Sequence, residues 1–249
     1  MRFSTLLRLC SFLSLSGSLF AQAGPRTMRF LPLGDSPPYR QEIRDGVAYE
    51  QEPPAGSIPP REVVFGANTT GNDESPLSLG RVSAPLKVAP GVGVLSLRRK
   101  GEGEKTAAWL NVEKPEKGDF LVLLWRDPDK KSWDAPRALV LPDSAEVAPE
   151  GTVRVVNISP VTLAIIFEGD KIQLPVGKTW QKAIPTGKDA TIQVGAVDAS
   201  GNLRRIHSGS VFQNAGERTL VAVYKADGVD PRRALKAIVQ REPVDPAKR

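Results

Sequence analysis

The sequence predicts an all-β protein built from two tandem antiparallel β-sandwich modules that are related by internal duplication. Three observations lead to this prediction. The stretch GDFLVLLWRDP at 118–128 is echoed by GERTLVAVYKAD at 216–227. Short runs rich in β-branched residues alternate with Gly, Pro and Asn turn signals along the chain. No segment sustains the apolar i, i+3, i+4, i+7 spacing of an amphipathic helix.

The repeat keeps one register over two consecutive strands. Residues 120–126 align without gaps on 219–225, and residues 138–141 align on 237–240 at the same offset. Upstream, TMRFLPLG from Thr27 echoes TVRVVNIS from Thr152. Equal loops between matching strands indicate a duplication. We expect a first module at 24–145, a linker at 146–151, a second module at 152–245 and a tail at 246–249.

The second module has the clearer strand pattern. Turn signals such as Glu168-Gly169-Asp170 separate its apolar runs, which is the spacing of an antiparallel sandwich. About eight strands are expected, at 152–157, 161–167, 171–174, 178–184, 190–197, 203–212, 218–225 and 234–240.

The repeated strand at 120–126 is apolar on both faces. Successive side chains of a strand point to opposite sides, and a sandwich strand normally alternates apolar and polar residues. We therefore expect 121–124 to be covered on both sides. The cover could be the other module, an insertion or a partner, or the outer face could lie under long neighbouring side chains.

The first module carries a proline-rich insertion near 34–80, with proline pairs at 37–38, 53–54 and 59–60 that disfavour regular ladder pairing. Tyr39 and Tyr49 lie in this segment, which we expect to be partly ordered against the sandwich. Long loops of this kind are often functional. The insertion is therefore the first place where a contact with a ligand or partner is expected.

The first 23 residues predict a signal peptide. Arg2 and Arg8 precede an apolar stretch at 9–20, and Ala21-Gln22-Ala23 has the small-x-small pattern of a cleavage site. We expect export to the periplasm or surface of a bacterium, with no integral membrane segment left after cleavage. Cleavage removes Cys10, the only cysteine, so the mature chain would be held by hydrophobic burial without disulfides.

The chain is mildly basic, with a formal net charge of +6. Loss of Arg2 and Arg8 would leave 32 Lys and Arg against 28 Asp and Glu, a net charge of +4. The basic residues are scattered in doublets, which is typical of a solvated surface, and no nucleic-acid-reading motif accompanies them. We expect no nucleic-acid partner.

Residues with catalytic chemistry are few. His207 is the only histidine, a strand would place it and Ser208 on opposite faces, and no G-x-S-x-G elbow surrounds the serine. Glu102 and Glu104 lie in a Gly-rich turn that is expected to be solvated. We predict a protein that is not an enzyme, with no catalytic residue and no cofactor.

Three carboxylates in one loop, Asp127, Asp129 and Asp134, form the nearest approach to a cation site. Lys130 and Lys131 interrupt them, and the regular spacing of a calcium loop is absent. No metal site is predicted.

Carbohydrate binding is the main alternative function, because sandwich modules can stack sugars on exposed aromatic rings. Trp133 and Trp180 have polar sequence neighbours, which is compatible with exposure, although buried strand tryptophans are commoner. Together with Tyr39 and Tyr49, Trp133 and Trp180 are the candidate contacts for a ligand or partner. The expected partner is a protein, through self-association or binding to an envelope component, with polysaccharide as the alternative.

One segment of the second module resembles a known family. Residues 153–160 read VRVVNISP and are followed by Gly169-Asp170 and the turn Pro175-Val176-Gly177. This pattern resembles exported bacterial domains of unknown function that open with V-R-V-V-N-x-S-P. The resemblance covers about one module, and the first module departs from it, reading MRFLPLGDSPP. It implies immunoglobulin-like sandwiches in the cell envelope, often in surface or assembly proteins, and brings no catalytic residues. We therefore expect a non-catalytic envelope component that binds or assembles.

Overall fold

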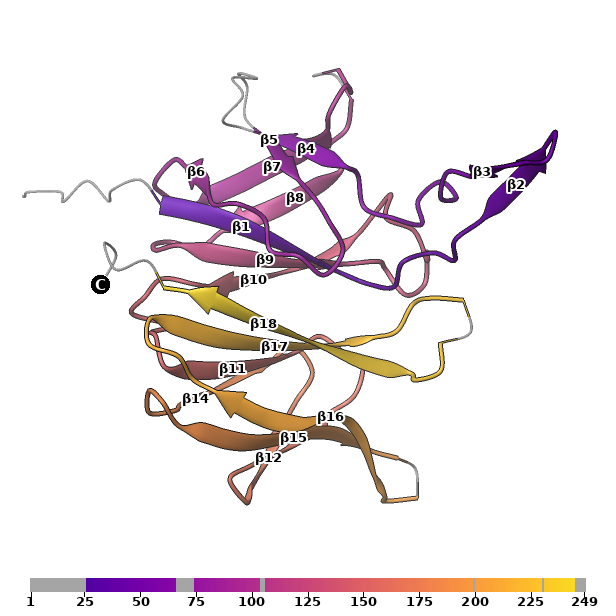
Figure 1. The fold of residues 1–249 in the computed structure, drawn as a ribbon. Coiled ribbons are helices and arrows are strands. Elements are labelled where there is room, and N and C mark those ends of the chain that lie inside the picture. Colours follow the sequence, from indigo (N-terminus) through magenta and orange to yellow (C-terminus); the bar gives the residue numbers. More distant parts are fainter. Residues whose placement is uncertain (1–25, 66–73, 104–105, 199, 230, 245–249) are drawn as a thin grey trace, which may run out of the picture.

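The computed structural model describes residues 26–65, 74–103, 106–198, 200–229 and 231–244. Every regular element in these ranges is a β-strand, which confirms the all-β prediction. Four of the sheets stack in layers, and the fifth is a two-stranded hairpin that projects from the body (Figure 1). The expected signal peptide at 1–23 and tail at 246–249 lie outside the described residues.

The N-terminal half, residues 26–142, contributes two of the layers. Its inner sheet has the order β10-β9-β1-β6, and its outer sheet has the order β5-β4-β7-β8. The inner strands are β1 (Arg26–Leu33), β6 (Leu86–Val88), β9 (Phe120–Trp125) and β10 (Arg137–Pro142). The outer strands are β4 (Glu62–Phe65), β5 (Glu74–Pro76), β7 (Gly93–Arg99) and β8 (Leu110–Lys114).

The C-terminal half, residues 152–244, contributes the other two layers. Its inner sheet has the order β14-β11-β17-β18, and its outer sheet has the order β13-β12-β15-β16. The inner strands are β11 (Thr152–Asn157), β14 (Thr179–Ala183), β17 (Glu217–Lys225) and β18 (Leu235–Pro243). The outer strands are β12 (Leu163–Phe167), β13 (Asp170–Leu174), β15 (Asp189–Val197) and β16 (Leu203–Phe212).

The two halves share strand order and register. Ala138 pairs with Leu124 between β10 and β9, and Ala237 pairs with Val223 between β18 and β17, at the offset of 99 seen in the sequence. The sheets are not wholly antiparallel as predicted, because β1 runs parallel to β9 and β11 runs parallel to β17. In each half, the chain passes through the outer sheet between the first inner strand and the strand that pairs parallel to it. A crossover of this kind allows parallel pairing.

Alternate residues of β9 belong to different hydrophobic clusters. Phe120, Val122 and Leu124 pack in the core of the N-terminal half, whereas Leu121 and Leu123 point the other way. The same alternation holds in β17, where Val221 and Val223 line the core of the C-terminal half. The burial of both faces of β9 confirms the expectation that this strand is covered twice.

The second cover is the other half of the chain. The outward faces of the two inner sheets pack against each other in a shared cluster that we call the seam (Figure 1). Its buried members are Leu31, Leu33, Leu121, Leu123, Leu141, Val156, Ile158, Leu220, Ala222 and Tyr224. The seam resembles a third hydrophobic core between the halves.

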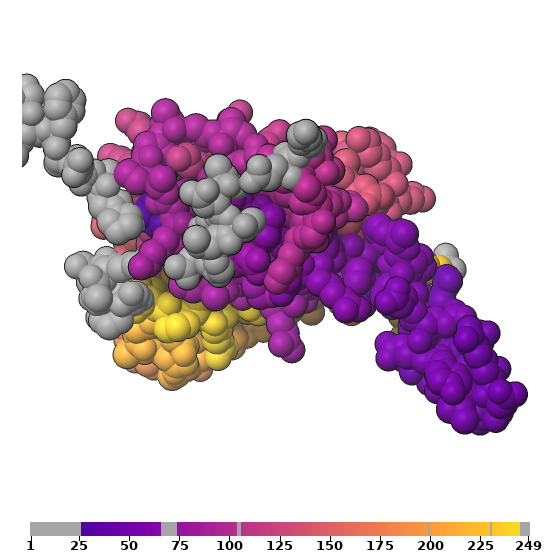
Figure 2. All heavy atoms as spheres, turned by 90° about the horizontal axis from the view of Figure 1, so that it is seen from above, coloured from indigo at the N-terminus to yellow at the C-terminus, as the bar shows by residue number. Residues whose placement is uncertain are grey.

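The predicted insertion near 34–80 is too wide. Its second part forms β4 and β5, which pair with each other and with β7, and Val63 and Phe65 are buried in the core. What projects from the body is the hairpin of β2 (Gln41–Arg44) and β3 (Val47–Glu50), in indigo in Figures 1 and 2. We call residues 39–52 the arm.

Candidate functional site

The arm carries large apolar side chains in solvent. Its strands pair from Gln41↔Glu50 to Arg44↔Val47, and the amide of Gln51 donates to the carbonyl of Arg40 at 2.9 Å across its neck. The exposed fractions are 65% for Tyr39, 75% for Ile43, 52% for Val47 and 53% for Tyr49. An isolated two-stranded hairpin is marginally stable in water, so an uncovered arm of this kind points to a binding element.

Both faces of the arm present apolar groups. Cross-strand partners share a face, so Ile43 lies beside Ala48 on one side, while Val47 and Tyr49 lie on the other. Every residue of β3 and three of the four residues of β2 are exposed. A partner could therefore contact either side, or enclose the arm between two surfaces.

The root of the arm is held against the C-terminal half by Asp35. Its carboxylate accepts from Lys236 Nζ at 2.6 Å and from the amide of Gly228 at 2.9 Å, and its own amide donates to Asp227 Oδ1 at 2.6 Å. Burial by itself raises the pKa of Asp35, but the Lys236 ammonium and the amides of Gly228 and Asp227 outweigh it, and the pKa lies below its ordinary value. The arm thus starts from an anchored point.

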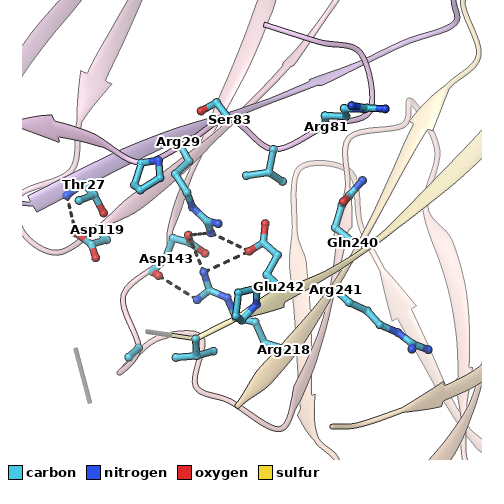
Figure 3. Close-up of a pocket in the computed structure, with 15 residues that line it drawn as sticks. Thr27, Arg29, Arg81, Ser83, Asp119, Asp143, Arg218, Gln240, Arg241 and Glu242 are labelled. Atoms are coloured by element: carbon cyan, nitrogen blue, oxygen red, sulfur yellow. Dashed lines mark hydrogen bonds and ion pairs between the residues drawn. The ribbon is translucent and has the colours of Figure 1, made fainter. Parts of the chain in front are cut away.

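A second polar feature closes the opposite end of the seam (Figure 3). Arg29 and Arg218 point at the carboxylates of Asp143 and Glu242. Arg29 Nη2 lies 2.8 Å from Glu242 Oε2 and also contacts Asp143, and Arg218 Nη2 lies 2.8 Å from Asp143 Oδ2. Arg154, on β11, interacts electrostatically with both carboxylates. We call these five residues the charge cluster.

Strand alternation explains the position of the charge cluster. Arg29 on β1 precedes the seam residue Leu31 by two positions, and Arg218 on β17 precedes the seam residue Leu220 by two positions. Both arginines therefore lie on the seam-facing side of their strands, nearer the end of the sheet. Burial lowers the pKa of Arg29, but Asp143 and Glu242 overcome that effect and the net pKa is raised. Burial is also the main reason that the pKa of Arg154 is lowered. The seam is thus apolar in the middle and ionic at this end.

A cleft of about 570 Å³ opens beside the charge cluster, and its lining comes from both halves. Glu242 is 7% exposed, and its Oε1 accepts no hydrogen bond from the described residues. Arg81 and Arg241 are exposed at the rim. The inward-facing charges are largely paired with one another, which fits a contact between halves.

The other end of the seam holds a pocket of about 430 Å³, which we call the seam pocket. Leu33, Trp125 and Leu139 of the N-terminal half face Ile158 and Val176 of the C-terminal half across it. Its volume and its largely apolar lining are typical of ligand-binding and side-chain-binding pockets. It lies next to the arm root, because Asp227 and Gly228 line it and also bind Asp35.

The rim of the seam pocket is basic. Lys131, Lys225, Arg126 and Arg137 line it together with Asp127 and Asp227, which leaves a net charge of +2. The two arginines are paired, Arg126 with Asp227 and Arg137 with Asp127 at 3.0 Å. Lys131 and Lys225 are exposed and form no ion pair with the described residues. Within the described part of the chain, two cations beside an apolar pocket thus have no carboxylate partner.

Trp133, a candidate ligand contact, is not exposed. Its side chain is 1% exposed within the core of the N-terminal half, and its carbonyl accepts a hydrogen bond from Trp109 Nε1. Trp180 is partly buried and meets Phe167 edge to face at a centroid distance of 5.2 Å. Trp125 lines the seam pocket. The four tryptophans therefore form no shared sugar-stacking surface.

The described residues weighed for catalysis and for cation binding are engaged in contacts other than a shared site. His207 is on β16, where burial lowers its pKa. Asp127 is paired with Arg137, and Asp134 accepts from Ser132 at 2.7 Å and also contacts Arg99. Among the described residues, no group of three His, Cys, Asp or Glu side chains could hold a metal ion.

Sequence reasoning named Tyr39 and Tyr49 and missed the rest of these features. Ile43 continues the apolar pattern of the arm and could have been added from the same segment. The signal for Arg29 and Arg218 was their polar character at positions that β-strand parity assigns to an apolar face. Lys131 and Lys225 are 94 positions apart in sequence, and only the packing of the halves unites them.

No protein-family model matches this chain, and no curated protein matches it either. Within the part of the chain that the structure describes, there is no helix with the length and apolarity needed to cross a membrane.

Proposed function

We propose that this chain is a non-catalytic, exported assembly protein of two duplicated immunoglobulin-like modules, which self-associates through the arm. The shared strand order and register of the halves support the duplication, and the sandwich layers support the immunoglobulin-like comparison. The pattern of residues 1–23 supports export.

The observation that carries the proposal is the exposure of four large apolar side chains on a hairpin outside the body (Figure 2). Burying a side chain of this size contributes about 1.5–3 kcal/mol. Within the described chain these side chains stay exposed, so that free energy is not gained. A protein surface that covers the arm would bury them and gain it.

The charge of the arm supports a second copy of the chain as the partner. Two arginines and four carboxylates leave residues 39–52 with a net charge of −2, although the whole chain carries +6. Opposite net charges favour contact between the arm of one copy and the body of another.

The test is the oligomeric state of the mature chain, residues 24–249, measured by sedimentation velocity. We expect a dimer that Ile43→Ser with Tyr49→Ser converts to monomer, because these changes remove apolar area and leave the exposed hairpin backbone unchanged. The matched control is Val92→Ser with Val94→Ser, which alters two exposed valines that belong to neither the arm nor the seam pocket. A monomeric parent chain, or a dimer that survives the arm substitutions, would contradict the proposal.

A further inference from the structure

We propose that the seam pocket is the receptor for the arm, so that two copies exchange arms and each arm seats in the pocket of the other. This inference rests on the proposed self-association and assigns the surface that receives the arm.

The chemistry of the two surfaces is complementary. The arm is apolar with a net charge of −2, and the seam pocket is apolar with a net charge of +2 at its rim. Glu42 pairs across the strands with Tyr49, and Glu50 lies on the face of Ile43, so an apolar side chain that enters the pocket brings a carboxylate of its own face to the edge. Lys131 and Lys225, which form no ion pair with the described residues, are the groups that such carboxylates would meet.

The size of the seam pocket also fits. A volume of about 430 Å³ accommodates large side chains but not a folded hairpin. The arm would therefore lay one face across the opening and insert only its apolar side chains. Val176, half-exposed at the edge of the pocket, would lie under the inserted face.

The position of the arm root makes the exchange reciprocal. Asp35 binds Asp227 and Gly228, which line the seam pocket, so each chain carries its arm and its pocket at the same end of the seam. The arm points away from the body (Figures 1 and 2), and none of its residues lines the seam pocket of its own chain. One two-fold rotation can bring each arm to the facing pocket, and that arrangement closes as a dimer.

The first experiment maps the contact by cross-linking, because the mature chain lacks cysteine. Tagged chains with Ile43→Cys are mixed with untagged chains with Val176→Cys under mild oxidation. We expect linked pairs to exceed those formed with Val94→Cys, an exposed residue on β7, by about tenfold, because docking raises the effective concentration of the two thiols. Equal yields with the Val176→Cys chain and with the β7 control would overturn the inference.

The second experiment alters the seam pocket, and its effect on dimerisation is compared with that of the arm substitutions. Val176→Asp with Lys131→Gln and Lys225→Gln should raise the dimer dissociation constant at least about tenfold, since it adds a repelling charge and removes two cations. The control is Lys130→Gln with Lys171→Gln, two exposed lysines that do not line the pocket.

The outcomes separate the two proposals. If the arm substitutions dissociate the dimer and the pocket substitutions do not, the pocket is not the receptor, while arm-mediated assembly stands. If neither set changes the dissociation constant, both proposals fall. If the lysine control weakens the dimer as much as the pocket substitutions, general charge rather than this pocket drives assembly, and the inference is overturned.

Discussion

Asp35 shows how one residue can fix the position of a functional element. Its carboxylate takes hydrogen bonds from Lys236 and from two main-chain amides of the C-terminal half, and its side chain is 10% exposed. Hydrogen bonds to a charged acceptor contribute about 1.5–3 kcal/mol. The arm therefore leaves the body from a point defined by both halves.

The Asp35→Asn substitution tests this anchor through its pH dependence. The folded-state pKa of Asp35 is lowered, so its contribution to stability is present above the unfolded value of about 3.9 and is lost as the pH falls through the folded value. We expect the substitution to cost about 2 kcal/mol at neutral pH and progressively less in acid. Urea unfolding at several pH values measures the difference.

Asp170→Asn, on the exposed strand β13, is the control and should have little effect at any pH. If Asp35→Asn and the parent chain lose stability in parallel on acidification, the Asp35 carboxylate is not the anchor.

At the scale of the element, β9 and β17 are buried on both faces, whereas a strand of an isolated two-layer sandwich has one buried and one solvent-exposed face. Each has alternate side chains in a module core and in the seam, and five of the six residues of β9 are buried. Polar residues on the outer face would suit an isolated sandwich better. The apolar residues on both faces of these strands are explained by the seam, which buries the second face.

A seam leucine should therefore behave as a core residue. Leu123 lies on the face of β9 that turns away from its own sandwich, yet it is fully buried. We expect Leu123→Ala to cost about 2–5 kcal/mol in the free energy of unfolding, similar to Leu124→Ala in the core. Denaturant titration of both variants gives the comparison, and a cost under about 0.5 kcal/mol for Leu123→Ala would mark it as a surface position.

At the scale of the whole molecule, four sheets form one stack with three apolar interiors (Figure 1). The seam is further closed by the charge cluster at one end and by Asp35 at the other. Breaking a buried ion pair by removing one partner costs about 3–5 kcal/mol, because the other charge stays buried and unpaired. The contact between halves is therefore too extensive for the halves to open independently.

We expect residues 24–249 to unfold in one cooperative transition. Far-UV circular dichroism reports both halves, whereas tryptophan fluorescence reports mainly the N-terminal half, which holds Trp109, Trp125 and Trp133. The two signals should give the same midpoint in guanidinium chloride. Separate midpoints would show that the halves are independent domains joined by a weak interface.

The sequence was sufficient for the features that depend on local pattern. The period-two alternation and the turn residues predicted the all-β class and the eight strands of the C-terminal half. The repeat at an offset of 99 matched β9 and β10 to β17 and β18, and these two pairs of strands have the same register. These properties are encoded by neighbours along the chain, so they can be read without coordinates.

Only the tertiary structure decided which surfaces meet. The apolar residues 121–124 had to be buried on both faces, but the sequence did not show what buries the second face. Burial by another module and burial by a partner both require apolar side chains, so the two cases have the same sequence pattern. Trp133 has polar neighbours in sequence and a core around it in space, while Lys131 and Lys225 come together only when the inner sheets pack. Long-range packing unites residues from distant segments, and the chain by itself fixes no distance between them.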